Sequence, residues 1–142
     1  SLPSLSSLQT LNLDRCRRLP TSGCKLIHAD HMPSLRHLNL SGSQVRDPIA
    51  VQLASLTELV SLDISSCVVG TGLALLCRNC TNLTALNISG TNFDDSQVAE
   101  LKSLTQLREL GLQFLPKVSD AGLANLSALT ELTLLDISRF AN

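Results

Sequence analysis

The segment LTALNISG, residues 83–90, decides how this chain folds. Its residues Leu86, Asn87 and Ile88 alternate between apolar and polar side chains. In an extended strand successive side chains point to opposite faces, so Leu86 and Ile88 would face a core and Asn87 would face solvent. A strand this short cannot be stable alone. The segment therefore predicts neighbouring strands of the same kind.

The same pattern recurs along the whole chain. It reads LQTLNL from residue 8, LRHLNL from 35, LVSLDI from 59, LTALNI from 83, LRELGL from 107 and LTLLDI from 132. The starting positions are separated by 27, 24, 24, 24 and 25 residues. A fixed period of this length is typical of repeat architectures, so residues 1–142 are predicted to form one repeat array.

The spacing L-x-x-L-x-L resembles the leucine-rich repeat. The resemblance implies an α/β solenoid, with short parallel strands on a concave face and short helices on a convex face. Two segments, CRRLPT at 16–21 and LPKVSDAGL at 115–123, look like the cysteine-containing subtype. Such arrays often serve as substrate-recognition regions of F-box subunits in ubiquitin ligases, so the resemblance implies that role by analogy.

Each strand is expected to lead through a turn into a helix. Asp and Thr side chains accept hydrogen bonds from the first free N–H groups of a helix, and such residues recur at Thr21, Asp47, Thr71, Asp95 and Asp120. Helices are therefore predicted near 22–31, 48–56, 72–79, 96–103 and 121–128. The strand exits carry the column Cys16, Ser43, Cys67, Thr91, Leu115 and Phe140. Cys, Ser and Thr can bond to backbone groups there, whereas Leu and Phe cannot.

The two ends of the array have no obvious polar cap. Residues 2–8 align with residues 101–107, so the chain begins partway through a repeat, and it ends just after the sixth strand. A terminal repeat without a cap leaves its apolar face uncovered. We expect a fragment of a longer array, or a chain whose ends associate with another copy.

Cys77 and Cys80 form a Cys-x-x-Cys, a spacing that occurs in zinc and redox sites. Counting back from the next strand places both in columns that are otherwise apolar, such as Leu53 with Cys77 and Leu56 with Cys80. A structural zinc needs four ligands, and the chain has no second cysteine pair. Both thiols are predicted to be buried, unligated and unbridged.

Composition and motifs give no support for catalysis or for a charged partner. The net charge of −1 makes no case for a nucleic-acid or membrane partner. Phosphate-loop, dinucleotide-loop and nucleophile-elbow motifs are missing, so we expect no enzyme activity and no cofactor. The charge is mildly polarised: residues 1–47 carry six basic and three acidic side chains, and residues 48–142 carry five and nine.

Three further features have ordinary interpretations. His28 and His31 could bind a metal with Asp30, but a solvated helix end explains them as well, and no metal site is predicted. Arg15, Arg17 and Arg18 could bind an acidic group or form a solvated turn. Five cysteines, an odd number without terminal pairs, favour a reducing location inside the cell, in cytoplasm or nucleus, over an extracellular one.

The outward strand positions predict the surface that could bind a partner. Small polar residues dominate three columns across the concave face, whereas interaction hot spots favour large aromatic residues and Arg. The middle repeats therefore look like a spacer, with contacts expected nearer either end. The candidate protein-binding residues are Arg15, Arg36, His37, Asp63, Arg108, Glu109, Phe114 and Arg139.

The resulting functional hypothesis is a protein–protein interaction module without enzymatic activity. One alternative is substrate recognition in a ubiquitin ligase, and another is a structural or regulatory scaffold in a larger intracellular assembly. A third alternative is that this segment is scaffold only, with the recognition surface in repeats outside it. End-to-end self-association through the uncapped repeats is a further expectation.

Overall fold

The computed structural model describes residues 4–18, 25–43, 48–69 and 72–138. Its six strands form one parallel sheet in chain order, β1-β2-β3-β4-β5-β6. The strands are β1 Thr10–Asn12, β2 His37–Asn39, β3 Ser61–Asp63, β4 Ala85–Asn87, β5 Glu109–Gly111 and β6 Leu134–Asp136. The pairing is in register from repeat to repeat, for example Leu38 with Leu62 and Leu62 with Leu86. The predicted array of parallel strands is confirmed.

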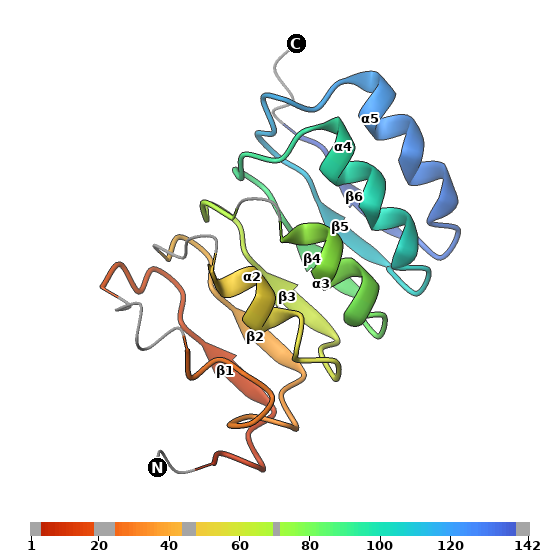
Figure 1. Cartoon of the computed structure of the whole chain (residues 1–142). Helices are drawn as coiled ribbons and strands as arrows, with labels where there is room; N and C mark the ends of the chain where they lie inside the picture. The colour runs from red at the N-terminus through yellow and green to blue at the C-terminus, as the bar shows by residue number, and fades with distance from the viewer. Residues whose placement is uncertain (1–3, 19–24, 44–47, 70–71, 139–142) are drawn as a thin grey trace.

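Short helices connect the strands and lie on one side of the sheet. They are α2 Pro48–Leu53, α3 Leu73–Asn79, α4 Asp95–Val98 and α5 Asp120–Ala124, with 3₁₀ turns η1 Ala99–Ser103 and η2 Asn125–Ala128. Figure 1 shows α2 to α5 in one row along the sheet. A parallel pair of strands needs a crossover connection, and these helices lie in the crossovers between β2 and β6.

The core lies between the sheet and the row of helices. The central strand residues point into it, and Leu38, Leu62, Leu86 and Leu110 are all buried. The leucines that begin the four middle repeats, at 35, 59, 83 and 107, are buried too, whereas those at 8 and 132 are partly buried. Branched aliphatic side chains fill the core almost alone, with Phe93 as its one large ring among the described residues. Each repeat therefore buries its apolar face only against its neighbours, as expected for a solenoid.

Three predictions about the helices need correction. Residues 25–31 run as turns and bends, so the helix predicted at 22–31 does not extend over them. The segments 96–103 and 121–128 are each half α-helix and half 3₁₀. The helix caps are Asp94 and Ser119, one residue before the predicted Asp95 and Asp120. The predicted caps Thr21, Asp47 and Thr71 lie outside the described residues.

Asp95 has a different role from the predicted cap. Its carboxylate accepts hydrogen bonds from the Ser119 N–H at 2.7 Å and from the Ser119 hydroxyl at 2.6 Å. Asp94 caps its own helix by accepting from the N–H groups of Ser96 and Gln97. Asp95 is therefore free to fix the start of α5 in the next repeat, which aligns the two helices.

Candidate functional site

The concave face of the sheet carries the outward strand residues in straight columns. One column contains Asn12, Asn39, Asp63, Asn87, Gly111 and Asp136, and a second contains Thr10, His37, Ser61, Ala85, Glu109 and Leu134. Both columns agree with the alternation of the sequence. Strand register thus brings residues about 24 positions apart in the chain to neighbouring places on one surface.

The first column stabilises the turns that follow the strands. The Oδ1 atom of each Asn or Asp accepts from the N–H group two residues later, as Asn39 does from Ser41 at 2.9 Å and Asp63 from Ser65 at 2.8 Å. Asn87 makes the same bond and donates from Nδ2 to Asp63 Oδ2 at 3.2 Å. Part of the hydrogen-bonding capacity of these side chains is therefore used within the array. The bonds hold the polar side chains of the concave face in defined orientations.

Gly111 interrupts the column of Asn and Asp residues, and the Asn87 side chain lies where a Cβ of residue 111 would stand. A Cβ atom at this position would lie 2.5 Å from Asn87 Oδ1, so no side chain fits beside the Asn87 amide as it stands. A hollow of about 280 Å³ lies here, with acidic Asp63, Glu109 and Asp136 and apolar Ala85 and Leu134 among its lining residues. The sequence signal for this hollow is the single Gly in a column of Asn and Asp.

A second hollow of about 270 Å³ adjoins the first and shares Asn87, Gly111 and Asp136 with it. Phe114 lies at its edge with 49% of its surface exposed. The Phe114 backbone has φ of 52°, in the left-handed region that costs a non-glycine residue about 1 kcal/mol or more. An exposed aromatic ring is thus held at the edge of the hollowed surface.

The left-handed backbone conformation recurs at one position in each of the first five repeats, and the sequence analysis did not predict it. It occurs at Arg15, Gly42, Ser66, Gly90 and Phe114, each seven residues after the first leucine of its repeat. Glycine adopts this conformation without the steric cost of a Cβ. The glycines at 42 and 90 were the available signal, because they share one repeat position with the three non-glycine residues.

The predicted binding residues do not form a single cluster. Asp63 and Glu109 line the first hollow, and Phe114 lines the second. Arg15, Arg36, His37 and Arg108 are exposed but line neither hollow. Arg139 lies outside the described residues. The hollows extend from β3 to β6, so they include middle strands that the sequence reading treated as a spacer.

The carboxylates of the first hollow have only neutral hydrogen-bond donors among the described residues. Asp136 accepts from the Ser138 N–H at 3.0 Å and from Gln113 Nε2. The Ser138 backbone and side chain, followed by Gln113, hold the pKa of Asp136 below its ordinary value. Within the described ranges the basic residues that form ion pairs are Arg15, His28 and Arg78, and none pairs with Asp63, Glu109 or Asp136.

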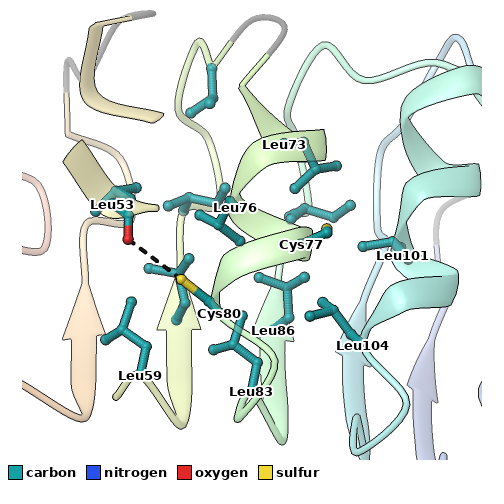
Figure 2. Packing of buried hydrophobic residues seen from close by; sticks show 14 of the residues in the cluster. Leu53, Leu59, Leu73, Leu76, Cys77, Cys80, Leu83, Leu86, Leu101 and Leu104 are labelled. Atoms are coloured by element: carbon teal, nitrogen blue, oxygen red, sulfur yellow. Dashed lines mark hydrogen bonds between the residues drawn. The ribbon is translucent and has the colours of Figure 1, made fainter. Parts of the chain in front are cut away.

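Three cysteines, Cys67, Cys77 and Cys80, are buried and pack in the core. Cys77 and Cys80 are free thiols that lie fully buried in the apolar core, so the predicted burial of both is confirmed. Cys80 Sγ donates to the carbonyl groups of Leu53 at 3.5 Å and Leu56 at 3.4 Å, the first of which Figure 2 shows. Burial raises the pKa of Cys77 to about 12 and that of Cys80 to about 11.

The predicted bonding at the strand exits is confirmed for three residues. Ser43 Oγ donates to the Leu13 carbonyl at 2.6 Å, and Cys67 Sγ donates to the Leu40 carbonyl at 3.1 Å, so each joins its repeat to the preceding one. Thr91 instead bonds within its own repeat, to the Ile88 carbonyl at 2.7 Å. Leu115 occupies the same column as a buried apolar residue.

The described residues contain no group of three or more His, Cys, Asp or Glu placed to hold a metal ion. The described helices are all too short or too polar to cross a membrane.

Comparison with known proteins agrees with this architecture. A family model described as "Leucine Rich repeat" matches residues 31–54 and 79–96. An internalin (inlF) from Listeria monocytogenes aligns over 95% of this chain and 36% of its own, with 23% identity and a TM-score of 0.65. The fold is a leucine-rich-repeat solenoid. These structural likenesses show the fold alone.

Two further proteins are similar to this chain. The tropomodulin C-terminal domain of Caenorhabditis elegans aligns over 90% of this chain and 86% of its own, with 17% identity and a TM-score of 0.70. The disease resistance protein RPP2A of Arabidopsis thaliana is 38% identical over 69 residues, 47% of this chain. The chain spans only 5% of that protein's length. A leucine-rich-repeat array implies a protein–protein interaction module.

Proposed function

We propose that the concave face over β3–β6 is the surface through which this array binds a protein partner. The observation that carries the proposal is the pair of adjoining hollows with Leu134 and Phe114 exposed at them, by 52% and 49%. Solenoids use extended concave surfaces for binding. Aromatic residues are enriched at protein interfaces, and the neighbouring Leu134 adds exposed apolar surface that a partner can bury.

Substitution at the face tests the proposal. We expect Leu134→Asp and Phe114→Asn to weaken partner binding at least about tenfold each, because removing an interface anchor commonly costs more than 1 kcal/mol. Asn tolerates the left-handed backbone at position 114. The partner is first obtained by affinity purification with the full-length protein, and dissociation constants are then measured by surface plasmon resonance.

The matched control is Leu75→Asp on α3, where an exposed apolar side chain on the helical side is replaced in the same way. This variant should bind the partner as the parent does. Unchanged binding by Leu134→Asp and Phe114→Asn, or equal loss in the control, would remove the concave face as the binding surface.

The specific biological role is also a proposal. Substrate recognition in a ubiquitin ligase draws its support from the resemblance of residues 16–21 and 115–123 to cysteine-containing repeats. The alternative, a structural or regulatory scaffold, draws support from the small polar residues at β1 and β2. Copurification of the full-length protein with ligase subunits would favour the first role, and stable assembly without them would favour the second.

Self-association is supported by a separate observation at β6. Leu135 and Ile137 are each 42% exposed, whereas the equivalent Leu110 and Leu112 are fully buried. A further repeat or a second copy stacked on β6 would cover these residues. Light scattering over a range of concentrations tests the second copy: a mass that stays monomeric contradicts it. An intracellular location, supported by three buried free thiols, is tested by microscopy of the full-length protein.

A further inference from the structure

The column that crosses β3 to β6 has a charge pattern that specifies its occupant. Asp63 and Asp136 stand at its two ends, and Asn87 and Gly111 stand between them. Neighbouring strands of a sheet are about 4.8 Å apart, so the two carboxylates are separated by three strand spacings, about 14 Å. Glu109 lies on the same hollow in the neighbouring column.

Among the described residues no Lys or Arg forms an ion pair with these carboxylates. All three carboxylates line the first hollow, and the hydrogen bonds that each Asp accepts within the described ranges come from neutral donors. The lining residues include no Lys or Arg. A partner with positive charge would meet carboxylates that are only partly desolvated, and complementary charge of this kind steers association and selects partners.

The middle of the column is shaped for an apolar side chain. The hollow over the middle of the column has apolar lining from Ala85 and Leu134. In an extended segment, residues i, i+2 and i+4 point to the same side, and i to i+4 covers about 13 Å. A segment that crosses the strands can therefore place side chains i and i+4 at Asp63 and Asp136, and side chain i+2 over the hollow between Asn87 and Gly111.

We propose that this face binds an extended basic segment of a protein partner, with Lys or Arg at positions i and i+4 and an apolar residue at i+2. The inference rests on the proposed function, because it names the chemistry of the partner at that same surface. Glu109 adds a third carboxylate beside the segment and strengthens the preference for positive charge.

Defined peptides and the 142-residue chain test the proposal. The probe is a seven-residue peptide with sequence Ser-Lys-Ser-Leu-Ser-Lys-Ser, and its control replaces both Lys by Glu. We expect the lysine peptide to shift the backbone NMR signals of Ala85 and Gly111, to bind more weakly as salt is raised, and to bind more tightly than the glutamate peptide.

Charge-neutral variants make the test specific. Asp63→Asn and Asp136→Asn retain the turn bond that Asn12, Asn39 and Asn87 make at the same position. Each should weaken the lysine peptide by about two- to fivefold, as expected for an exposed ion pair. Glu109→Gln should do the same, whereas Glu131→Gln, also exposed but outside the hollow, should leave binding unchanged.

The outcomes separate this inference from the proposed function. The preference for a basic segment would be overturned by equal NMR shifts from both peptides or by no shift from either. Full binding of the lysine peptide by a variant that combines Asp63→Asn, Glu109→Gln and Asp136→Asn would overturn it too. If Leu134→Asp still abolishes partner binding in that case, the concave face stands and only the partner chemistry is wrong. If Leu134→Asp also binds normally, both proposals fail.

Discussion

The close contact between α2 and α3 provides a sharp test of how consecutive repeats pack. A Cβ atom added at Gly72 would lie 1.9 Å from Ala50 Cβ and 3.2 Å from Ala50 Cα. Carbon atoms in contact are normally about 3.5 to 4.0 Å apart. Gly72→Ala therefore requires the two helices to move apart at a position where Ala50 is buried.

The size of the effect follows from opposing contributions. Overpacking a core costs about 1 to 3 kcal/mol, while replacing Gly by Ala at a compatible backbone stabilises by about 0.4 to 1 kcal/mol through the unfolded chain. Gly72 has φ of −77° and ψ of −4°, which Ala adopts freely. We expect Gly72→Ala to lower the free energy of unfolding by about 1 to 2 kcal/mol.

A second substitution separates the clash from other effects. Ala50→Gly removes the methyl group that the new Cβ would meet, at a cost of about 2 kcal/mol from lost helix propensity and lost burial. The double variant should then be more stable than the sum of the two single effects predicts, by at least about 1 kcal/mol.

Urea unfolding followed by circular dichroism measures all four proteins of this cycle. Effects that add to within about 0.5 kcal/mol would show that residues 50 and 72 do not touch as the structure has them. A Gly72→Ala variant more stable than the parent would contradict the packing argument outright.

Three further predictions concern the backbone, the repeat-to-repeat bonds and the thiols. Ser66→Gly should raise the free energy of unfolding by about 1 kcal/mol in urea titrations, because it relieves the left-handed backbone at φ of 55°; a loss of stability would argue against that conformation. Asp95→Ala should lower the free energy of unfolding by about 1 to 3 kcal/mol by removing both bonds to Ser119. Ser119→Ala should cost less in the Asp95→Ala background than in the parent, where it removes the bond to Asp95 as well as the cap bond to the Ala121 N–H; equal costs in the two backgrounds would contradict the pairing. At pH 8 Cys77 should resist alkylation while half-buried Cys16 reacts, as peptide mass spectrometry would show; alkylation of both at equal rates would contradict the burial of Cys77. The free energy of unfolding should also fall as pH rises from about 9 towards 12, because the raised pKa of Cys77 favours the neutral thiol in the folded state.

The strand register was predictable because one constraint fixes it. Leu38, Leu62, Leu86 and Leu110 must all point into the core, and a shift of one residue would turn every one of them to solvent. The polar columns on the opposite face follow from the same alternation. Burial of Cys77 and Cys80 was predictable for this reason too, since each stands in an apolar column.

The helix caps and the hollows were less predictable, because neighbouring residues of similar chemistry can make the same local hydrogen bonds. Asp94 and Asp95 are adjacent and both can cap a helix, and only the position of Ser119 in the next repeat shows which does. The hollow beside Gly111 depends on side chains from neighbouring repeats, including Asn87 and Leu134. Repeat periodicity fixes where residues stand but not how much space their neighbours leave.

Site-specific photocrosslinking in the full-length protein tests the central claim most directly. A photoreactive amino acid is placed in separate variants at Ala85, on the concave face, and at Leu75, on the helical side. We predict a crosslink to the partner from position 85 and none from position 75. A partner crosslink from position 75 with none from position 85 would contradict the assignment of binding to the concave face.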